Sequence, residues 1–444
     1  MVHYKEENYL IIQPGSQSTY VSFGLEDSLA PPAYVFPTKV YQSGDNFSCT
    51  DSSLPEVYPI VGGEIINIEA LKYLIKVIVK SLNKQFPLKL TSLIPLLLLS
   101  SFHWSRLHIE QLTQYALEDL QFLGFNILPT CLGNLFSVSR EGLATATVID
   151  IGYERTEITP IIDYLPARFA STTVKLGGQS IDQEIRRYLP DFSPLQIDAL
   201  KKSDIFEVLS HADKISSFYG LDELTKEEEG ILDVAAIVTS NNTKEIIEGK
   251  KKKEKTEKPN SELEINTFPD PISGEDISVG LQRFRGCEPL LEAISHHLYI
   301  QLGKIDDLAK RQELWDNLIV VGPTTLIKGF TEALLVQLGD DWLVVPPNKA
   351  GSNALAAFQA TSALSASGEQ FNLQQVPRSL KPVKVPEYFP EWKSVPGSFE
   401  NCLSVLGGQI YCKQIFGELG EDSFVTKDSY DDKGPLLVWD VCLS

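Results

Sequence analysis

The sequence of 444 residues predicts an α/β protein built from two related halves. The chain opens with a strand, a glycine-containing turn and a second strand at Tyr9–Ile12 and Val21–Phe23, and the pattern returns at Ala146–Ile151 and Ile158–Ile162. A further hydrophobic strand, Asn317–Val321, again ends at a glycine. This repetition favours a duplicated architecture over a simple alternation of strands and helices.

The segments between the two openings predict one helix and one buried strand. Residues 42–58 are polar and rich in turn-forming residues, which indicates a loop or a small subdomain. Apolar residues recur at helical spacing over Ile68–Leu82. The apolar run Leu93–Leu99 contains Pro95 and is far too short to span a bilayer, so we expect a core strand and no membrane association.

Two segments predict surface insertions. Residues 240–262 include a charge-rich stretch, 248–259, which is typical of a disordered surface loop. Lys250–Lys253 also fit a nuclear-import signal, and the sequence leaves both interpretations open. Residues 349–385 are rich in Ala, Ser, Gly and Pro and predict a second, flexible insertion.

Composition excludes some classes of function. The formal net charge of −20 argues against a general surface that binds nucleic acid, because binding the phosphate backbone needs a positively charged surface. The six cysteines include no C-x-x-C pair and no zinc-site spacing, so we expect a reducing compartment and no bound metal. The N-terminal segment has no signal-peptide pattern.

Seven short strings, in order along most of the chain, resemble those of the actin family. They are Gln13–Ser16 with Val21–Gly24 and Val35–Pro37, Pro59–Ile60 with Gly63–Ile66, Asp150–Gly152, Leu176–Gly178, Gly280–Arg285 with Glu288, Gly322–Thr325, and Leu406–Gly408 with Tyr430–Pro435. Each string alone is a weak signal, but their shared order is specific. The resemblance implies an actin-like fold of two lobes, each an RNase H-like mixed sheet with helices, on either side of a central cleft.

Further strings resemble the fungal chromatin-remodelling branch of the actin-related proteins. They are Leu200–Ser210, Gly177–Ile181, Tyr388–Lys393, and Gly434–Pro435 followed by Trp439–Val441. This resemblance implies a nuclear, non-catalytic structural and regulatory subunit of a SWI/SNF-type remodeller such as SWI/SNF or RSC. The implied partners are an actin-related protein of the seventh type, the helicase-SANT-associated helix of the remodeller ATPase, and other remodeller subunits, with no direct contact to nucleic acid.

The resemblance also implies the domain boundaries. A first large subdomain would comprise 1–38, 60–140 and 386–444, a reduced small subdomain 39–59, a third subdomain 141–176 and 287–348, and a fourth subdomain 177–286 with the charged insertion 240–262.

The positions that hold ATP in the family carry unsuitable residues here. Gln13 stands in place of an aspartate that helps to hold the hydrated cation, and Tyr20 in place of a phosphate-neutralising lysine. Tyr153 and Glu154 occupy the second phosphate loop, where the bulk of one and the charge of the other oppose a phosphate. Pro323 replaces a glycine on the adenosine side, which should narrow that loop.

The catalytic glutamine is also missing, since no glutamine occurs from residue 126 to residue 152. Other residues of a nucleotide cleft persist: Gly15, Ser16, Asp150, Gly152, Gly178, Asp213, Gly322 and Thr324. They fit either weak nucleotide binding or tight turns that the fold needs without a ligand, and we favour the second interpretation. We therefore expect no ATP hydrolysis, no catalytic residue and no resident cofactor, while weak ATP binding stays open.

A partner-binding groove is implied by the resemblance at residues 129–142, where family members accept amphipathic helices. Leu132, Leu135 and Phe136 lie at helical spacing in this segment, and they fit a groove wall or core packing equally well.

Other candidate residues favour ordinary structural roles. His103 and His108, the adjacent His296 and His297, and the pair Asp306–Asp307 have spacings that fit packing or a solvated helix face better than a metal or catalytic site.

Two other classes of function remain as alternatives. One is an active actin-fold ATPase of the sugar-kinase or chaperone type, which the altered phosphate loops disfavour. The other is a filament-forming cytoskeletal relative, which the shortened segment 39–59 disfavours.

Overall fold

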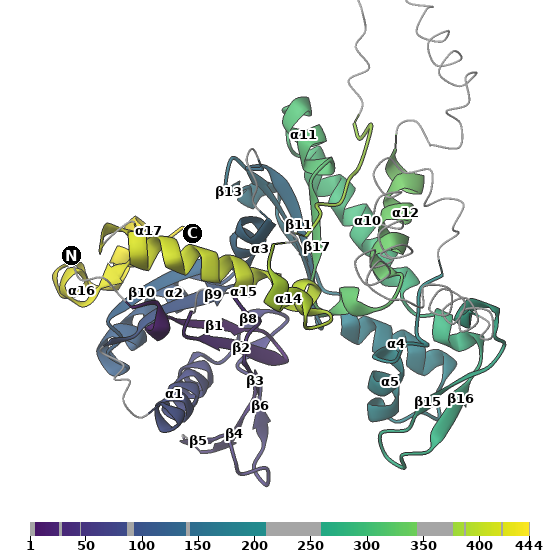
Figure 1. The fold of residues 1–444 in the computed structure, drawn as a ribbon, viewed down its shortest axis with the longest axis horizontal. Helices are drawn as coiled ribbons and strands as arrows, with labels where there is room; N and C mark the ends of the chain where they lie inside the picture. The colour runs from purple at the N-terminus through teal and green to yellow at the C-terminus, as the bar shows by residue number, and fades with distance from the viewer. Residues whose placement is uncertain are drawn as a thin grey trace, which may run out of the picture. The chain divides into compact units, whose positions relative to one another are not determined.

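The computed structural model describes residues 5–25, 29–44, 46–86, 93–138, 143–209, 259–343, 376–385, 388–418 and 421–443. Asp213, Lys250–Lys253, most of the predicted insertion 240–262 and residues 349–375 of the second insertion lie outside the described residues. The chain forms two compact units (Figure 1). The first unit is Met1–Gly178, Leu318–Thr325 and Val383–Ser444, and the second is Gln179–Asn317 and Leu326–Pro382.

The first sheet of the first unit has six strands in the order β18-β10-β9-β1-β2-β3. The strands are β1 (Leu10–Pro14), β2 (Ser18–Phe23), β3 (Tyr34–Pro37), β9 (Pro95–Ser100), β10 (Gly124–Pro129) and β18 (Val425–Thr426). β1 and β2 form the predicted hairpin, while β1 pairs with β9 in parallel and β9 with β10 in parallel. The predicted core strand is confirmed as β9, which is buried along its whole length.

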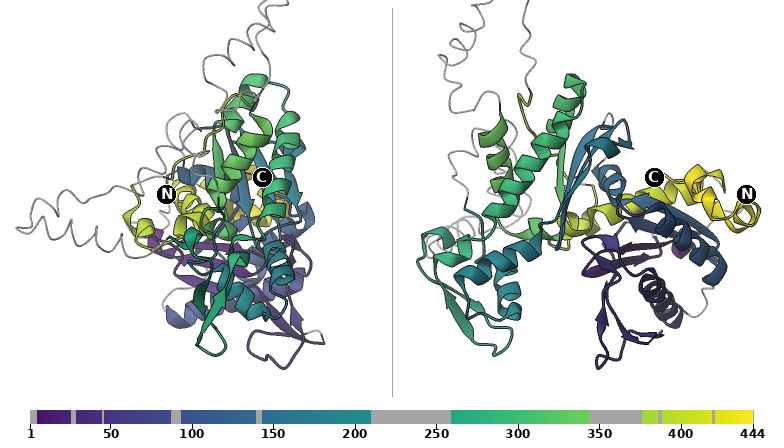
Figure 2. Two further views of the ribbon diagram at one scale, coloured as in Figure 1. Left: turned by 90° about the vertical axis from the view of Figure 1, so that its right-hand side faces the viewer. Right: turned by 180° about the vertical axis from the view of Figure 1, so that it is seen from behind.

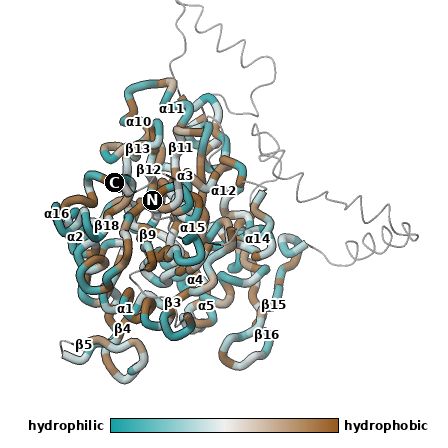
Figure 3. The backbone as a smooth tube through the Cα atoms, turned by 60° about the vertical axis from the view of Figure 1, so that its left-hand side comes forward, coloured by the Kyte–Doolittle hydropathy of each residue, from teal (hydrophilic) through white to brown (hydrophobic). Residues whose placement is uncertain are grey.

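Helices cover both faces of this sheet, as the two views in Figure 2 show. On one face, Leu10 and Ile12 of β1 pack in a core with α1 (Ile68–Gln85), which confirms the predicted helix and extends it by one turn. On the other face, Ile11 packs in a second core with α3 (Thr130–Val138) and α15 (Ser398–Cys412). The hydrophobic segments of these cores can be followed in Figure 3.

The second sheet repeats the pairing around β1. Its order is β13-β12-β11-β17, with β14 also paired to β12, and its strands are β11 (Ala146–Ile151), β12 (Thr156–Ile162), β13 (Leu165–Pro166), β14 (Thr172–Val174) and β17 (Leu318–Val321). β11 is antiparallel to its hairpin partner β12 and parallel to β17, as β1 is to β2 and β9. The predicted second hairpin and third strand are therefore confirmed.

Two small sheets follow the first hairpin. β4 (Val40–Ser43), β5 (Asn46–Ser48) and β6 (Glu56–Val57) form a three-stranded sheet from the segment for which the sequence predicted a loop or a small subdomain. β7 (Ile60–Val61) and β8 (Glu64–Ile65) form a hairpin whose two turn residues, Gly62 and Gly63, both have positive φ. Glycine suits these positions because it has no Cβ.

The helix α15 crosses α3 at very close range. A Cβ at Gly407 of α15 would overlap the carbonyl group of Gly133 in α3, so only glycine allows this approach. The helix also departs from helical geometry at Cys402, where φ is −131° and ψ is 22°. The remaining helices of this unit are α2 (Arg106–Gln114), α14 (Pro390–Lys393), α16 (Lys427–Lys433) and α17 (Val438–Val441), with π-helical turns at Tyr115–Asp119 and Lys413–Glu418.

The second unit is mainly helical. It contains α4 (Gly178–Tyr188, whose first residue belongs to the first unit), α5 (Pro194–Lys201), β15 (Asn266–Pro269), β16 (Asp276–Val279), α10 (Glu288–Gly303), α11 (Leu308–Trp315) and α12 (Phe330–Trp342). The fully buried Arg283 donates to the carbonyl oxygens of Gly280 at 2.7 Å and Asn260 at 2.7 Å. Within the described part of the chain, no helix is long and apolar enough to cross a membrane.

Candidate functional site

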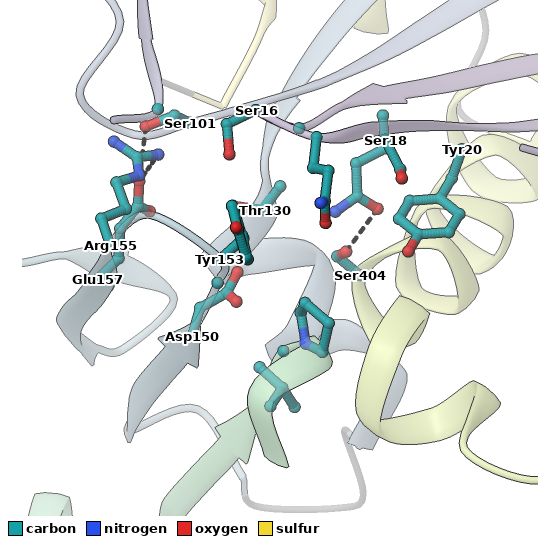
Figure 4. Close-up of a pocket in the computed structure, with 18 of the residues that line it drawn as sticks. Ser16, Ser18, Tyr20, Ser101, Thr130, Asp150, Tyr153, Arg155, Glu157 and Ser404 are labelled. Carbon is teal, nitrogen blue, oxygen red and sulfur yellow. Dashed lines mark hydrogen bonds and ion pairs between the residues drawn. The ribbon is translucent and has the colours of Figure 1, made fainter. Parts of the chain in front are cut away.

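The turns of the two hairpins, β1–β2 and β11–β12, line one cavity in the first unit (Figure 4). The lining also includes residues of α3 and α15, the segment after β17, and Ile60, Gly63, Ser101 and Trp104. Five of the residues predicted from the sequence lie here: Gly15, Ser16, Asp150, Gly152 and Gly322.

The two hairpin turns have the same hydrogen bond. The N–H of Gly15 donates to the carbonyl oxygen of Ser18 at 2.9 Å, and the N–H of Gly152 donates to that of Arg155 at 2.9 Å. A Cβ would lie only 2.9 Å from the accepting oxygen at Gly15 and 3.1 Å from it at Gly152. Both glycines therefore serve the closure of their own turns.

The carbonyl group of Gly152 joins two of the other predicted site residues. It accepts the N–H of Gly178 at 3.0 Å and the hydroxyl of Thr324 at 2.9 Å. Gly322 has a φ of +106°, and a Cβ there would overlap the backbone of Ile151. Gly178 and Gly322 thus make close backbone contacts in this region, and Thr324 binds the same loop through its hydroxyl.

Side chains of the first hairpin bind to α15. The hydroxyl of Ser404 donates to Gln13 Oε1 at 2.8 Å, and the hydroxyl of Tyr20 donates to Asn401 Oδ1 at 3.0 Å. Burial raises the pKa of Tyr20 to about 12, so the phenol stays neutral where the family has a lysine. The two substituted positions of the first hairpin are thus occupied with partners from the same chain.

The second loop binds the β7–β8 turn. The carboxylate of Glu154 accepts the N–H of Gly62, and the guanidinium of Arg155 lies against Gly63, where a Cβ would overlap it. Trp104 Nε1 also donates to the carbonyl oxygen of Gly63 at 3.0 Å. Three side chains therefore hold this turn at the edge of the cavity.

Asp150 has an unusual electrostatic environment. Burial and the nearby Glu157 raise its pKa to about 7, although Arg155 opposes the shift. Arg155 forms an ion pair with Glu157, which also accepts the hydroxyl of Ser101 at 2.8 Å. The Asp150 carboxyl therefore holds its proton more strongly than an exposed aspartate does.

Sequence reasoning missed Asn134. This residue of α3 is 1% exposed, lines the cavity, and has a side-chain nitrogen without a hydrogen-bond partner in the described structure. The resemblance to the family predicts a glutamine in this segment, and asparagine, whose amide side chain is shorter, does not match that expectation. A search for any amide in the helix before β11 would have found it.

The predicted groove residues separate into two groups. Leu132 and Leu135 are 2% and 0% exposed and belong to the core, one of the two roles that the sequence left open. Phe136 is half-buried, stacks on Tyr411 with ring centroids 5.7 Å apart, and lies 6.2 Å from the ring of Tyr164. Phe136 is thus the member of the set that a partner could contact.

Two of the other candidate residues, Asp307 and His103, have environments that fit an ordinary structural role. Asp307 caps α11 by accepting the N–H groups of Ala309 and Lys310. Burial lowers the pKa of His103, which keeps the ring neutral. In the described ranges, no group of three or more His, Cys, Asp or Glu side chains is placed to hold a metal ion.

Most of the sequence matches a known family. A profile of the family described as Actin matches residues 4–343. The chain belongs to the actin family. This membership, with the mixed α/β sheets, confirms the predicted actin-like fold class.

Individual relatives within the family point to its actin-related proteins. The chain is 28% identical to "SWI/SNF and RSC complexes subunit arp9" of Schizosaccharomyces pombe, with 99% of each chain covered. It is 24% identical to "Actin-related protein 7" of Arabidopsis thaliana over 75% of this chain and 71% of that protein. It is also 24% identical to "Actin-related protein 4" of Candida albicans, over 42% of this chain and 39% of that protein. The predicted relationship to actin-related proteins is confirmed.

Proposed function

We propose that this actin-family chain is a non-catalytic structural and regulatory subunit of a nuclear chromatin-remodelling complex of the SWI/SNF type. The observation that carries the proposal is its similarity, over 99% of both chains, to a subunit named for the SWI/SNF and RSC complexes. Because similarity extends end to end, the two proteins share a whole architecture rather than one module.

The cavity residues support a role without catalysis. A hydrated magnesium ion needs oxygen ligands with negative charge, and Gln13 offers a neutral amide that already accepts a hydrogen bond from Ser404. A triphosphate needs free positive charge and backbone donors, but the cavity presents the Tyr20 phenol and the Glu154 carboxylate, and the cation among its lining residues, Arg155, is paired with Glu157. These residues do not fit ATP with its cation, so we assign the function to surfaces instead.

The proposed partners are an actin-related protein of the seventh type and the helicase-SANT-associated helix of a remodeller ATPase. The half-buried Phe136, stacked on Tyr411, offers a rigid aromatic anchor of the kind that reads an amphipathic helix. The net charge of −20 favours a basic partner helix through electrostatic complementarity.

Co-purification of the full-length chain with this helix, with and without the seventh-type partner, tests the proposal. We expect a stable ternary complex, and we expect Phe136→Ala to weaken it by about tenfold or more, the size of effect typical of a buried aromatic anchor. Tyr188→Ala removes an exposed aromatic side chain from the second unit and serves as the control. The proposal fails if no complex forms and the isolated chain turns over ATP.

A further inference from the structure

Two acidic side chains lie directly opposite each other beside the cavity. Asp150 of β11 and Glu157 of β12 are register partners in an antiparallel pair, so their side chains share one face of the sheet. The Glu157 side chain is only 7% exposed. Two carboxylates in this arrangement repel each other, and burial strengthens the repulsion because it removes screening by water.

Arg155 supplies the opposing charge. Its guanidinium forms an ion pair with Glu157, and its side chain is 14% exposed. Another cation near His103, Arg168, has its guanidinium over the ring of Phe102 at 4.3 Å. His103 is held neutral by burial and contributes no charge. Arg155 is thus the cation that pairs with Glu157 and whose charge opposes the raised pKa of Asp150.

The same guanidinium fixes a second element. It occupies the space above Gly63 where any other residue would place its Cβ. The neighbouring Glu154 accepts the N–H of Gly62 in the same turn. Arg155 therefore connects the β7–β8 turn to the β11–β12 hairpin, two elements far apart in the sequence. Figure 4 shows its guanidinium near Ser101 and Glu157 at the edge of the cavity.

We propose that Arg155 is a built-in cation of the cavity wall: its guanidinium offsets the charge of the opposed Asp150 and Glu157 carboxylates and holds the β7–β8 turn against the second hairpin. The wall is then held together by the chain itself and needs no bound cation or ligand. This inference concerns the first unit alone and stands apart from the proposed role in remodelling.

The charge part of the proposal is tested by thermal unfolding of the full-length chain in the presence of a chelator. Arg155→Met keeps most of the side-chain length but removes the charge, whereas Arg155→Lys keeps a charge. We expect the Met variant to lower Tm by roughly 2–4 °C or more, the scale of a 1 kcal/mol change in a domain of 150–250 residues, and the Lys variant to lower it less. Equal losses in the two variants would overturn the role of Arg155 as a counterion.

A double variant provides the second arm of the charge test. Because Glu157→Gln removes one of the two acids, it should restore part of the Tm that Arg155→Met loses. Strictly additive losses would show that the residues do not interact, and would contradict the proposal.

The connection to the turn is tested with two neighbouring glycines. Gly62 and Gly63 both have positive φ, but a Cβ at Gly62 meets nothing within 4 Å, while one at Gly63 meets Arg155. Gly62→Ala is therefore the matched control, since it carries the backbone strain alone. We expect Gly63→Ala to lower Tm further than Gly62→Ala in the native sequence, and the excess to disappear in the Arg155→Met background. An excess that persists there would refute the packing of Arg155 on this turn.

Discussion

Single residues decide what the cavity can bind. Gln13 and Tyr20 are predicted from the sequence alone to suit a cation and phosphate poorly, because the chemistry of one side chain depends little on its surroundings. Their partners, Ser404 and Asn401, could not be recognised, because they lie 391 and 381 residues away along the chain. The fold brings the two residues of each pair together, and no local pattern in the sequence predicts these contacts.

The pKa of Asp150 gives a prediction at this scale. The folded state holds the proton of this carboxyl up to about pH 7, whereas an unfolded aspartate releases it near pH 3.9. Between these values the folded state binds more protons than the unfolded state, so the contribution of Asp150 to stability falls as the pH rises from about 4 to about 7. Asp150→Asn removes this dependence.

We therefore expect Asp150→Asn to be more stable than the native chain at pH 8, by about 1–2 kcal/mol after allowance for solvent screening, and equal to it near pH 4. Urea unfolding at both pH values measures the difference. Asp306→Asn, at an exposed site in the second unit, is the control. A difference between Asp150→Asn and the native chain that does not change with pH would contradict the raised pKa.

Helices and strands agree with the sequence predictions where the hydrophobic pattern that predicts them lies within one segment of the chain. The strand Ala146–Ile151 has the predicted bounds, and the helix predicted at Ile68–Leu82 continues to Gln85. These segments carry their own hydrophobic periodicity, which a sequence shows directly. The close crossing of α3 and α15 has no such signal, because Gly133 and Gly407 are single glycines in different helices.

This crossing gives a prediction for the element scale. Gly407→Ala places a methyl group against the backbone of Gly133, so the two helices must separate. We expect a loss of stability of about 1–3 kcal/mol, as for other overpacked cores, measured by chemical denaturation. Gly303→Ala in α10 is the matched control, because its Cβ meets nothing within 4 Å and alanine favours a helix. Equal effects of the two substitutions would show that the crossing tolerates a side chain.

The whole molecule combines a family fold with a cavity whose side chains bind one another. Membership of the actin family follows from strings spread over most of the chain, so a sequence match identifies it. The division into two compact units, and the return of residues 318–325 and 383–444 to the first unit, depend on contacts between distant segments. The predicted subdomain boundaries stay predictions.

The prediction for the whole molecule concerns nucleotide binding. A ligand at 100 times its Kd stabilises a protein by about 2.7 kcal/mol, which a thermal melt detects. We expect millimolar ATP with magnesium to leave Tm unchanged and to show no turnover, because Tyr20 and Glu154 replace the charges that ATP requires. An active actin-fold ATPase assayed in parallel is the positive control. A clear rise in Tm would support weak nucleotide binding, and turnover would support the ATPase alternative.

The sequence by itself determined the two strand–turn–strand units, the glycines that close them, and the family. These features depend on residue type and on neighbours a few positions away. Only the tertiary structure decided that Arg155 joins Glu157 and the turn at Gly63, that Asn134 lines the cavity, and that α15 binds the first hairpin. Such contacts join segments far apart in the chain, and the shape of two packed surfaces selects them rather than any local pattern.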